Sequence, residues 1–285
     1  MNIGIRLHDA CPGTLQQRAQ AAHAQGFGCV QLALGKALGE PYAQPAAMTA
    51  GLAAEVMRAL SPLKVAVLGC YLNLAHPDET VYRDTLARYR AHLRFSRWLG
   101  DCVVGTETCN PNPAGQYDPA VTHSDAALES FLRRLEPVVK DAEQLGATLA
   151  VEPVYTHIVS TPARARRVLD TFRSPNLKII LDPVNLLHPD NLPRTDEVLD
   201  EAADLLLRDT AVMHIKDYRV VGSALQAVAA GQGQMAYARF LRRVAAEKPS
   251  LCVTLENTAP DNAEAARLFV QAELRKAQAD VAKGL

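Results

Sequence analysis

Short apolar runs alternate with longer stretches rich in Ala, Leu and Arg from one end of the chain to the other. The runs are almost continuously hydrophobic, as expected of strands that are buried on both faces of a sheet. They predict strands at 2–7, 28–34, 64–74, 102–106, 147–153, 177–182, 211–216 and 251–256. The stretches between them predict helices at 14–25, 50–60, 79–99, 124–145, 162–173, 195–208, 237–247 and 261–280.

This alternation predicts an α/β fold with a parallel sheet. Eight strand–helix pairs in 285 residues match the size and repeat number of a TIM barrel, a single (β/α)8 domain that spans residues 1–285. A doubly wound open sheet is the alternative, but a glycine-rich dinucleotide-binding turn does not follow the first strand. Helix-end signals support the element boundaries: Ser124 and Thr161 stand where N-caps are expected, and Gly146 stands at a helix end.

The longest connections follow the second, fourth, sixth and seventh predicted strands. Segments 107–123 and 184–194 are rich in Pro and Asn, and segment 217–236 ends in AGQGQM. In a barrel, all of them lie at the C-terminal ends of the strands, where the active sites of barrel enzymes are built. The opposite connections, from helix to strand, look short, which favours a functional face at the strand C-termini.

Residues with metal-binding side chains stand at the ends of the last four predicted strands. They are Glu152, Asp182, His214 and Glu256, and their spacings of 30, 32 and 42 residues each fit one strand–helix repeat. Taken singly, each could be a helix cap or a surface residue. If the four strands are neighbours in a barrel, however, the four side chains converge on one point.

The chemistry of this quartet indicates a metal. A buried carboxylate is costly unless it is paired or binds a cation, and three carboxylates close together repel one another. A divalent cation removes that repulsion. One imidazole among oxygen ligands suits Mn, Mg, Co or Zn. The sequence therefore predicts one divalent metal ion as cofactor and a reaction that transfers protons.

The composition limits the classes of molecule that this protein is expected to bind. Lys and Arg total 30 against 31 for Asp and Glu, so the net charge of −1 gives no argument for binding nucleic acid or a membrane surface. The chain lacks an apolar run of about 18 residues, so we expect no transmembrane helix. The N-terminal MNIGIRL lacks the features of a signal peptide, and the six cysteines form no CxxC pair. We therefore expect a cytoplasmic protein with reduced thiols that acts on a small molecule.

The segments LAVEP, ILDPVNLLH, HIKD, AGQGQMAYARFLRRV and TLEN resemble the xylose isomerase-like TIM barrels. This superfamily includes sugar-phosphate isomerases, ketose 3-epimerases, inosose dehydratases and hydroxypyruvate isomerase. The resemblance covers the C-terminal half, whereas the N-terminal half matches only in its strand–helix rhythm. It implies that Glu152, Asp182, His214 and Glu256 bind one divalent metal, commonly Mn, Co or Mg. It also implies that Glu152 and Glu256 exchange protons with the substrate carbon, and that a homo-oligomer is possible.

The chain departs from the ketose 3-epimerase pattern at three positions. Asn185 stands where those enzymes typically carry a His, and Val220, beside Arg219, stands where they carry an Arg. Ile158, beside His157, stands where they tend to carry a Glu. These differences widen the expectation from a ketose 3-epimerase to an enolising enzyme of the superfamily.

Further candidates for substrate contact lie at strand ends on the same face. Lys216 stands two positions after His214, and alternate residues of a strand point to the same side. Lys216 is therefore expected to point into the barrel, where it could bind a substrate oxygen or pair with a ligand carboxylate. The other candidates, each of which could also be a polar loop residue, are His8, His76, Glu107, His157, Asn185 and His188.

The leading interpretation is a metal-dependent isomerase or epimerase of a small sugar or polyhydroxy ketone. The reaction passes through an enediolate, with Glu152 and Glu256 as the acid–base pair. The alternative is a metal-dependent dehydratase, an inosose- or dehydroshikimate-type lyase, which uses the same site. An endonuclease IV-like repair enzyme would need more histidines and a basic face, and a non-catalytic sugar-binding barrel would not need the full quartet.

Overall fold

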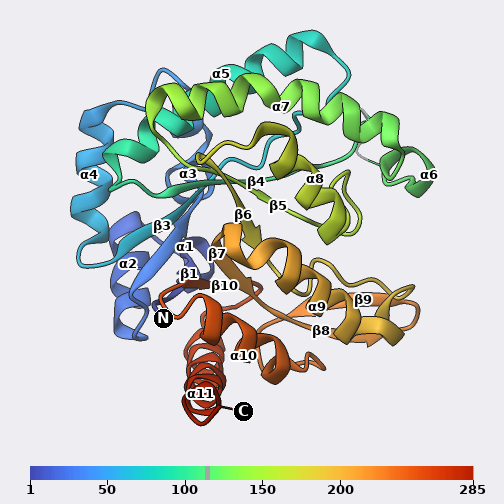
Figure 1. Cartoon of the computed structure of the whole chain (residues 1–285). Coiled ribbons are helices and arrows are strands. Elements are labelled where there is room, and N and C mark those ends of the chain that lie inside the picture. The colour runs from blue at the N-terminus through green and yellow to red at the C-terminus, as the bar shows by residue number, and fades with distance from the viewer. Residues whose placement is uncertain (113–115, 285) are drawn as a thin grey trace.

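Eight parallel strands close into a barrel in the computed structural model, which describes residues 1–112 and 116–284 (Figure 1). In their order around the barrel, the strands are β1 (Ile3–Arg6), β10 (Cys252–Leu255), β7 (Thr210–Ile215), β6 (Leu177–Leu181), β5 (Leu149–Glu152), β4 (Val103–Glu107), β3 (Lys64–Gly69) and β2 (Cys29–Leu32). The strand β1 closes the ring because Ile5 lies opposite Val30 of β2 and opposite Leu255 of β10. The predicted (β/α)8 barrel is thus confirmed, and the open sheet is excluded.

Helices lie outside the ring of strands (Figure 1). Those that match the eight predicted helices are α2 (Leu15–Ala24), α4 (Ala50–Leu60), α5 (Glu79–Trp98), α7 (Asp125–Leu145), α8 (Pro162–Phe172), α9 (Thr195–Leu206), α10 (Tyr237–Glu247) and α11 (Ala263–Ala282). The expected end signals act as caps. The hydroxyl of Ser124 accepts a hydrogen bond from the backbone N–H of Ala127 at 3.1 Å, and Gly146 ends α7 in the left-handed conformation with φ of 62°.

The loops at the C-terminal ends of the strands contain short elements that the sequence pattern did not predict. They are α1 (Leu7–Ala10), α3 (Leu34–Leu38), η1 (Glu40–Ala43), α6 (Pro119–Thr122) and η2 (Leu192–Arg194), and a further turn, η3 (Leu207–Asp209), precedes β7. Residues 113–115 of the predicted loop 107–123 lie outside the described residues. These elements are one to two turns long, too short for a helical period to stand out in the sequence.

Segment 217–236, predicted as a loop, contains an antiparallel hairpin. Its strands are β8 (Asp217–Val221) and β9 (Ala224–Val228), joined by Gly222 and Ser223. Gly222 has a φ of 60°, as tight hairpin turns require. A two-residue Gly–Ser turn between short β-branched runs is the signal that could have predicted this hairpin.

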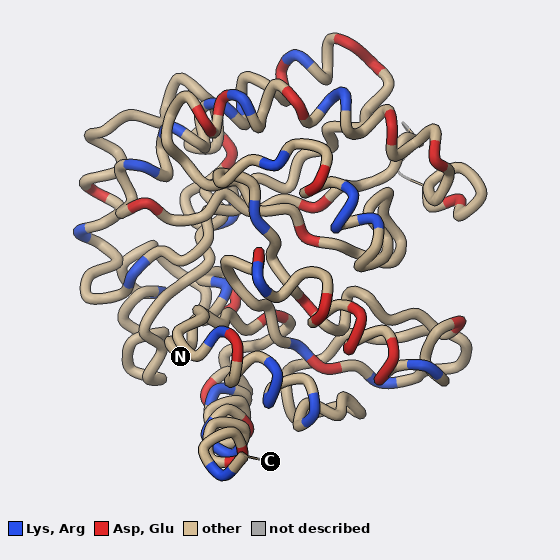
Figure 2. Tube along the Cα trace, viewed as in Figure 1, with Lys and Arg blue, Asp and Glu red and all other residues tan. Residues whose placement is uncertain are grey.

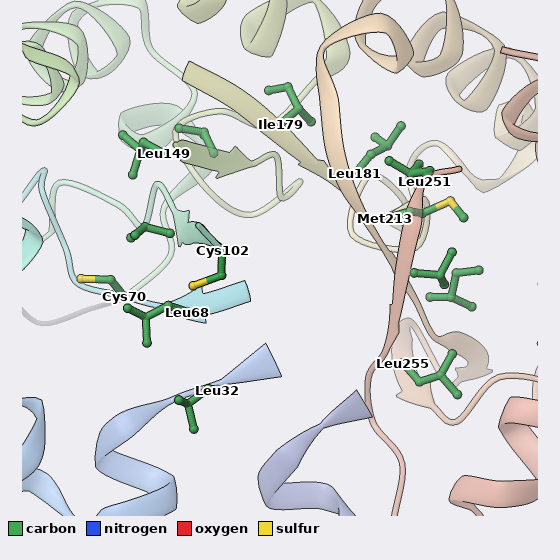
Figure 3. Close-up of a cluster of buried hydrophobic side chains, with 14 of the residues drawn as sticks. Leu32, Leu68, Cys70, Cys102, Leu149, Ile179, Leu181, Met213, Leu251 and Leu255 are labelled. Atoms are coloured by element: carbon green, nitrogen blue, oxygen red, sulfur yellow. The ribbon is translucent and has the colours of Figure 1, made fainter. Parts of the chain in front are cut away.

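Strand parity decides which side chains enter the barrel, because residues in register on neighbouring parallel strands point to the same side. A small buried cluster fills the middle of the barrel, and its members are Val67, Ala150, Ile180 and Val212. The residues between these positions belong to the larger core beneath the helices, as Leu68, Leu181 and Leu255 show in Figure 3. Two positions beyond the cluster residues of β5, β6 and β7, the inward side chains are polar: Glu152, Asp182 and His214.

Charged residues of both signs are distributed over the barrel in the view of Figure 2. Many of them pair between neighbouring helices, as Arg90 of α5 does with Asp141 of α7 at 2.8 Å. Within the described part of the chain, we find no helix with the length and apolar composition required to cross a bilayer. All six cysteines are described, and each carries a free thiol.

Substitution of Gly105 by Ala is expected to destabilise the protein by about 1–3 kcal/mol through overpacking of the barrel interior. A Cβ atom at Gly105 would lie 2.7 Å from Ile180 Cδ1 and 2.8 Å from Val67 Cγ1. Denaturant unfolding of Gly105→Ala and of the wild type measures the difference. Gly51→Ala in α4 is the matched control, because its nearest neighbour atom would lie 3.7 Å away. An unchanged midpoint for Gly105→Ala would show that the interior tolerates the added methyl group.

Candidate metal centre

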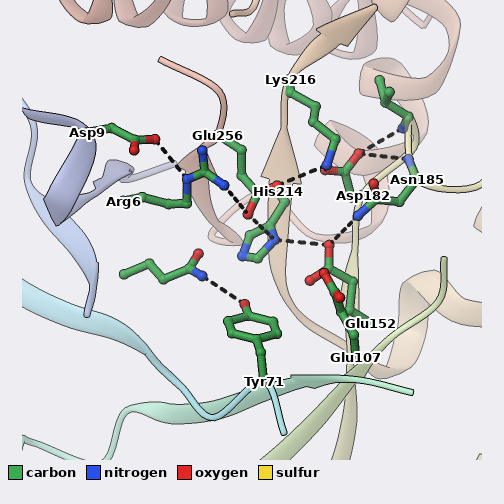
Figure 4. A network of polar contacts seen from close by, with 12 residues as sticks. Arg6, Asp9, Tyr71, Glu107, Glu152, Asp182, Asn185, His214, Lys216 and Glu256 are labelled. Carbon is green, nitrogen blue, oxygen red and sulfur yellow. Dashed lines mark hydrogen bonds and ion pairs between the residues drawn. The ribbon is translucent and has the colours of Figure 1, made fainter. Parts of the chain in front are cut away.

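The four predicted ligands converge at the C-terminal end of the barrel. Glu152 ends β5, His214 lies near the end of β7, and Asp182 and Glu256 directly follow β6 and β10. Each offers a ligand atom, and these atoms all lie within 4.8 Å of one another. All four side chains are buried (Figure 4). The convergence expected from the spacing of the residues is therefore present in the folded chain.

Contacts within the quartet fix its geometry. His214 Nδ1 lies 3.2 Å from Glu152 Oε1 and 3.4 Å from Glu256 Oε1. Asp182 Oδ1 accepts hydrogen bonds from the backbone N–H groups of Val184 and Asn185, at 2.8 and 3.2 Å. The turn that follows β6 thus holds one oxygen of Asp182.

Burial and the neighbouring carboxylates raise the pKa of two acids of the site, Asp182 and Glu107. Burial raises the pKa of Asp182 to about 6, although Lys216 opposes the shift. Burial and the charges of Glu152 and Glu256 raise the pKa of Glu107 to about 7. A negative charge at either position is therefore costly when the site holds no additional cation.

The pKa shifts of two other groups of the site, Glu256 and His214, favour their charged forms. Burial by itself opposes charge on Glu256, but Lys216, His214 and Arg6 lower its pKa to about 2. Burial likewise opposes charge on His214, but Glu152 and Glu256 raise the pKa of His214 to about 9. At neutral pH the quartet therefore carries a protonated imidazole, which must release its proton for the imidazole to bind a metal.

The donor set fits a divalent cation. Three carboxylates face one another, and Lys216 balances part of their charge, with Nζ at 3.1 Å from Asp182 Oδ2 and 2.9 Å from Glu256 Oε2. The contact to Asp182 lacks hydrogen-bond geometry, so this buried oxygen has no hydrogen-bond partner among the described residues. A carboxylate oxygen with unused lone pairs, three acids and one imidazole are a suitable ligand set for Mn, Mg, Co or Zn.

Three of the other predicted site residues lie at the quartet. Lys216 contacts two of its carboxylates, as stated above. Asn185 Nδ2 donates a hydrogen bond to Glu152 Oε1 at 2.8 Å. Glu107 lies opposite Glu152 in the register of β4 and β5, so both side chains point into the barrel mouth.

Of two further predicted residues, His157 borders this group and His8 lies beside Asp9 and Lys36. His157 Nδ1 lies 3.8 Å from Glu107 Oε2, and burial lowers the pKa of His157 to about 4. His8 lies 3.6 Å from Asp9 and 3.5 Å from Lys36. Burial lowers the pKa of His8 to about 4 as well, so both imidazoles are neutral at pH 7.

The remaining two predicted histidines make their contacts within the loops. His76 Nδ1 accepts a hydrogen bond from the backbone N–H of Asp78 at 3.2 Å. The ring of His188 stacks on Tyr155 with centroids 4.3 Å apart, and its Nδ1 lies 2.9 Å from Asp190 Oδ2. A direct role of His76 and His188 in substrate binding stays a prediction.

Asp217, the first residue of β8, anchors the loop that follows the hairpin. Its carboxylate accepts hydrogen bonds from the backbone N–H groups of Gly231, Gly233 and Met235 at 3.1, 3.0 and 2.8 Å. A Cβ atom at Gly233 would lie 2.3 Å from Asp217 Oδ1, so only glycine fits there. The glycines of AGQGQM thus form a turn around a carboxylate.

Sequence reasoning missed three polar residues on the N-terminal half of the barrel: Arg6, Gln31 and Tyr71. Arg6 Nε donates to Asp9 at 2.8 Å, and its guanidinium lies 3.8 Å from Glu256 Oε1. Gln31 Nε2 donates to the Tyr71 hydroxyl at 2.8 Å. The available signal was a single polar residue within each apolar strand, Arg6 in NIGIRL and Gln31 in GCVQLAL.

The xylose isomerase-like TIM barrel family matches residues 19–273 of the chain. The chain belongs to this family. No curated protein sequence matches the chain, so the comparison with individual proteins rests on solved structures.

Several solved structures share the fold over nearly the whole chain. A D-tagatose 3-epimerase-like protein has a TM-score of 0.75 and 16% identity, and the match covers 99% of this chain and 100% of that protein. The 3-keto-D-glucoside 4-epimerase YcjR from E. coli has a TM-score of 0.71 and 17% identity, with 95% and 99% covered. The IOLI protein with a bound zinc atom has a TM-score of 0.72 and 16% identity, with 99% and 98% covered. At these identities the likeness establishes the fold.

Proposed function

We propose that this protein is a divalent-metal-dependent isomerase or epimerase of a small sugar or polyhydroxy ketone. The observation that carries the proposal is the buried quartet of Glu152, Asp182, His214 and Glu256 within 4.8 Å at the barrel mouth. Membership of the xylose isomerase-like family supports it. So do the epimerases among the similar structures and the zinc atom in one of them.

The proposed acid–base pair is Glu152 and Glu256. Their strands, β5 and β10, are separated on the ring by β6 and β7, so the two carboxylates approach the centre of the site from different directions. A carboxylate on one face of the substrate can remove the proton beside the carbonyl, and one on the other face can return it. Return to the same carbon inverts that centre, and return to the neighbouring carbon interconverts aldose and ketose.

The other residues of the site would bind and orient the substrate. A divalent cation held by the quartet would supply Lewis-acid polarisation of the substrate carbonyl. Lys216, whose ammonium group lies among the carboxylates, would donate to the oxygen on which negative charge develops. Glu107 and Asn185 would hydrogen-bond substrate hydroxyls from β4 and from the loop after β6.

A metal-dependent dehydratase of inosose or dehydroshikimate type is the second candidate. The same deprotonation gives dehydration if a β-hydroxyl group leaves in place of reprotonation. Lys216 favours this candidate, because its ammonium group lies 2.9 Å from Glu256 and could donate a hydrogen bond to the leaving hydroxyl. Ultraviolet absorbance of an α,β-unsaturated product separates the two reactions.

Metal analysis combined with solvent exchange tests the proposal. We expect about one equivalent of divalent metal per chain, as the single quartet implies. Incubation in deuterium oxide with a panel of ketoses, inososes and hydroxypyruvate is expected to label the carbon next to the carbonyl of at least one compound. Metal at the level of the buffer would contradict the central claim. Metal without any exchange across the panel would contradict the enolising reaction.

A further inference from the structure

The second nitrogen of His214 faces away from the carboxylates. Nδ1 makes the contacts to Glu152 and Glu256, whereas Nε2 is buried and has no hydrogen-bond partner among the described residues. In Figure 4, this edge of the ring turns toward the side on which Tyr71 lies. A metal-binding histidine usually donates the proton of its other nitrogen to an acceptor, which fixes the tautomer and the ring orientation. The structure therefore raises the question of which group accepts the proton of Nε2.

Two buried oxygens inside the barrel also lack a hydrogen-bond partner in the described part of the chain: Thr254 Oγ1 and Gln31 Oε1. Thr254 is fully buried and lies opposite His214 in the register of β10 and β7. Because residues in register point to the same side, both side chains enter the barrel at one level. Gln31 is 2% exposed and lies opposite Arg6 in the register of β2 and β1.

The strand β1 lies between these two oxygens and carries a glycine at the level of Thr254. Thr254 lies opposite Gly4 of β1, and Gly4 lies opposite Cys29 of β2. Since Gly4 has no side chain, groups from β2 and β10 meet across β1, as the thiols of Cys29 and Cys252 do at 3.2 Å. Side chains of β2 and β10 can thus contact each other across β1 on the inner side of the barrel.

The amide of Gln31 is held in place by the Tyr71 hydroxyl, to which its Nε2 donates at 2.8 Å. The Tyr71 ring in turn lies against Gly69, where a Cβ atom would be 2.8 Å from ring atom Cε2. In this orientation of the amide, Oε1 remains as an acceptor. The three unpartnered atoms are therefore one N–H donor and two oxygens.

We propose that Gln31 and Thr254 are positioning residues that hold the imidazole of His214 from behind through one bound water molecule. The water accepts the proton of His214 Nε2 and donates to Gln31 Oε1 and Thr254 Oγ1. Three hydrogen bonds to otherwise unpartnered buried groups are typical of an internal water. This proposal rests on the proposed metal-dependent function, since a fixed imidazole keeps Nδ1 directed at the metal.

Metal affinity of the whole protein tests the proposal. Gln31→Met and Thr254→Val are each expected to weaken Mn²⁺ binding by about 10- to 100-fold in calorimetric titration, and Thr254→Ser is expected to restore it. The double variant should lose less than the product of the two factors, because both residues act through the same water. The visible spectrum of the Co²⁺-loaded protein should change in Gln31→Met and Thr254→Val.

Thr210→Val is the matched control. Thr210 is a buried threonine at the start of β7, and its hydroxyl donates to the Leu206 carbonyl at 2.9 Å. This variant should lose stability but keep its Mn²⁺ affinity and Co²⁺ spectrum. The test requires that the wild type binds Mn²⁺. Given that, unchanged affinity in Thr254→Val, or an equal loss of affinity in Thr210→Val, would overturn the proposal.

A measurement on the metal-free protein separates this proposal from the proposed function. The ¹⁵N resonances of the His214 ring, assigned by comparison with His214→Gln, report the proton on Nε2 and its hydrogen bond. We expect Thr254→Val and Gln31→Met to shift the Nε2 resonance, and Thr210→Val to leave it in place. Unmoved resonances in Thr254→Val and Gln31→Met would overturn the positioning role. A wild type that binds no Mn²⁺ would instead contradict the metal-dependent function.

Discussion

Replacement of Glu256 by Gln is expected to lower the rate of substrate deuterium exchange by about 10²–10⁴-fold, the usual contribution of a positioned acid or base. The pKa of Glu256 lies at about 2 because Lys216, His214 and Arg6 outweigh the effect of burial, so this side chain is an ionised carboxylate at neutral pH. The amide of Gln has a similar shape but cannot take up a proton at neutral pH. Exchange of the carbon-bound proton, followed by NMR in deuterium oxide, measures the effect.

Two controls show whether a loss of exchange in Glu256→Gln comes from the missing carboxylate. The circular dichroism spectrum of Glu256→Gln should remain that of the wild type, because the amide oxygen can still accept from Lys216. Its unfolding midpoint should be lower, because Gln lacks the charge that Lys216, His214 and Arg6 stabilise. Glu55→Gln, on the exposed side of α4, is the matched control and should exchange at the wild-type rate. Wild-type exchange in Glu256→Gln would remove Glu256 from the acid–base pair.

Replacement of Asp182 by Asn is expected to weaken binding of a divalent metal by at least about 100-fold. The side chain is fully buried and keeps its bonds to the backbone N–H groups of Val184 and Asn185 through one oxygen, which Asn can reproduce. The second oxygen, which faces Lys216, is replaced by a neutral group with no lone pair for a metal. Calorimetric titration with Mn²⁺ measures the affinity, and metal affinity equal to that of the wild type would exclude Asp182 as a ligand.

Without metal, Asp182→Asn should raise the free energy of unfolding at neutral pH, although it weakens metal binding. Because burial raises the pKa of Asp182 to about 6, above its ordinary value, the folded state holds the proton more tightly than the unfolded state does. The free energy of unfolding of the wild type should therefore fall as the pH rises from about 4 to about 6, as linkage requires. In Asp182→Asn this part of the decrease should disappear. An identical pH profile for the two proteins would show that the carboxylate ionises without cost.

The sequence predicted the barrel strands and their helices because both depend on local, repeating patterns. Runs such as KIILD and CVTLE are largely apolar, and the N-caps Ser124 and Thr161 start α7 and α8 where these helices were expected to begin. The quartet could be predicted for a related reason. In a parallel barrel, residues at the C-terminal ends of successive strands must meet, whatever the intervening helices contain.

The sequence did not predict which loop residues reach the site. His188 and Asn185 are only three positions apart, yet the amide of Asn185 bonds Glu152 while the ring of His188 stacks on Tyr155. The difference is set by the path of the turn after Asp182, whose backbone N–H groups bind the carboxylate of Asp182 itself. Residue type and spacing carry no information about such a path.

What the sequence by itself determined is the eightfold alternation and the four ligand types at the strand ends, since both follow from hydrophobic periodicity and strand parity. What only the tertiary structure decided is the set of groups around those ligands. Arg6 reaches Glu256 because β1 pairs with β10, and Gln31 of β2 meets Tyr71, which follows the neighbouring strand β3. For Lys216 the structure shows the expected pairing with ligand carboxylates, since its ammonium group lies beside Asp182 and Glu256. The physical reason is that a strand register fixes the height and the facing of each side chain, whereas contacts across the barrel depend on which other side chains leave room, as Gly4 and Gly69 do.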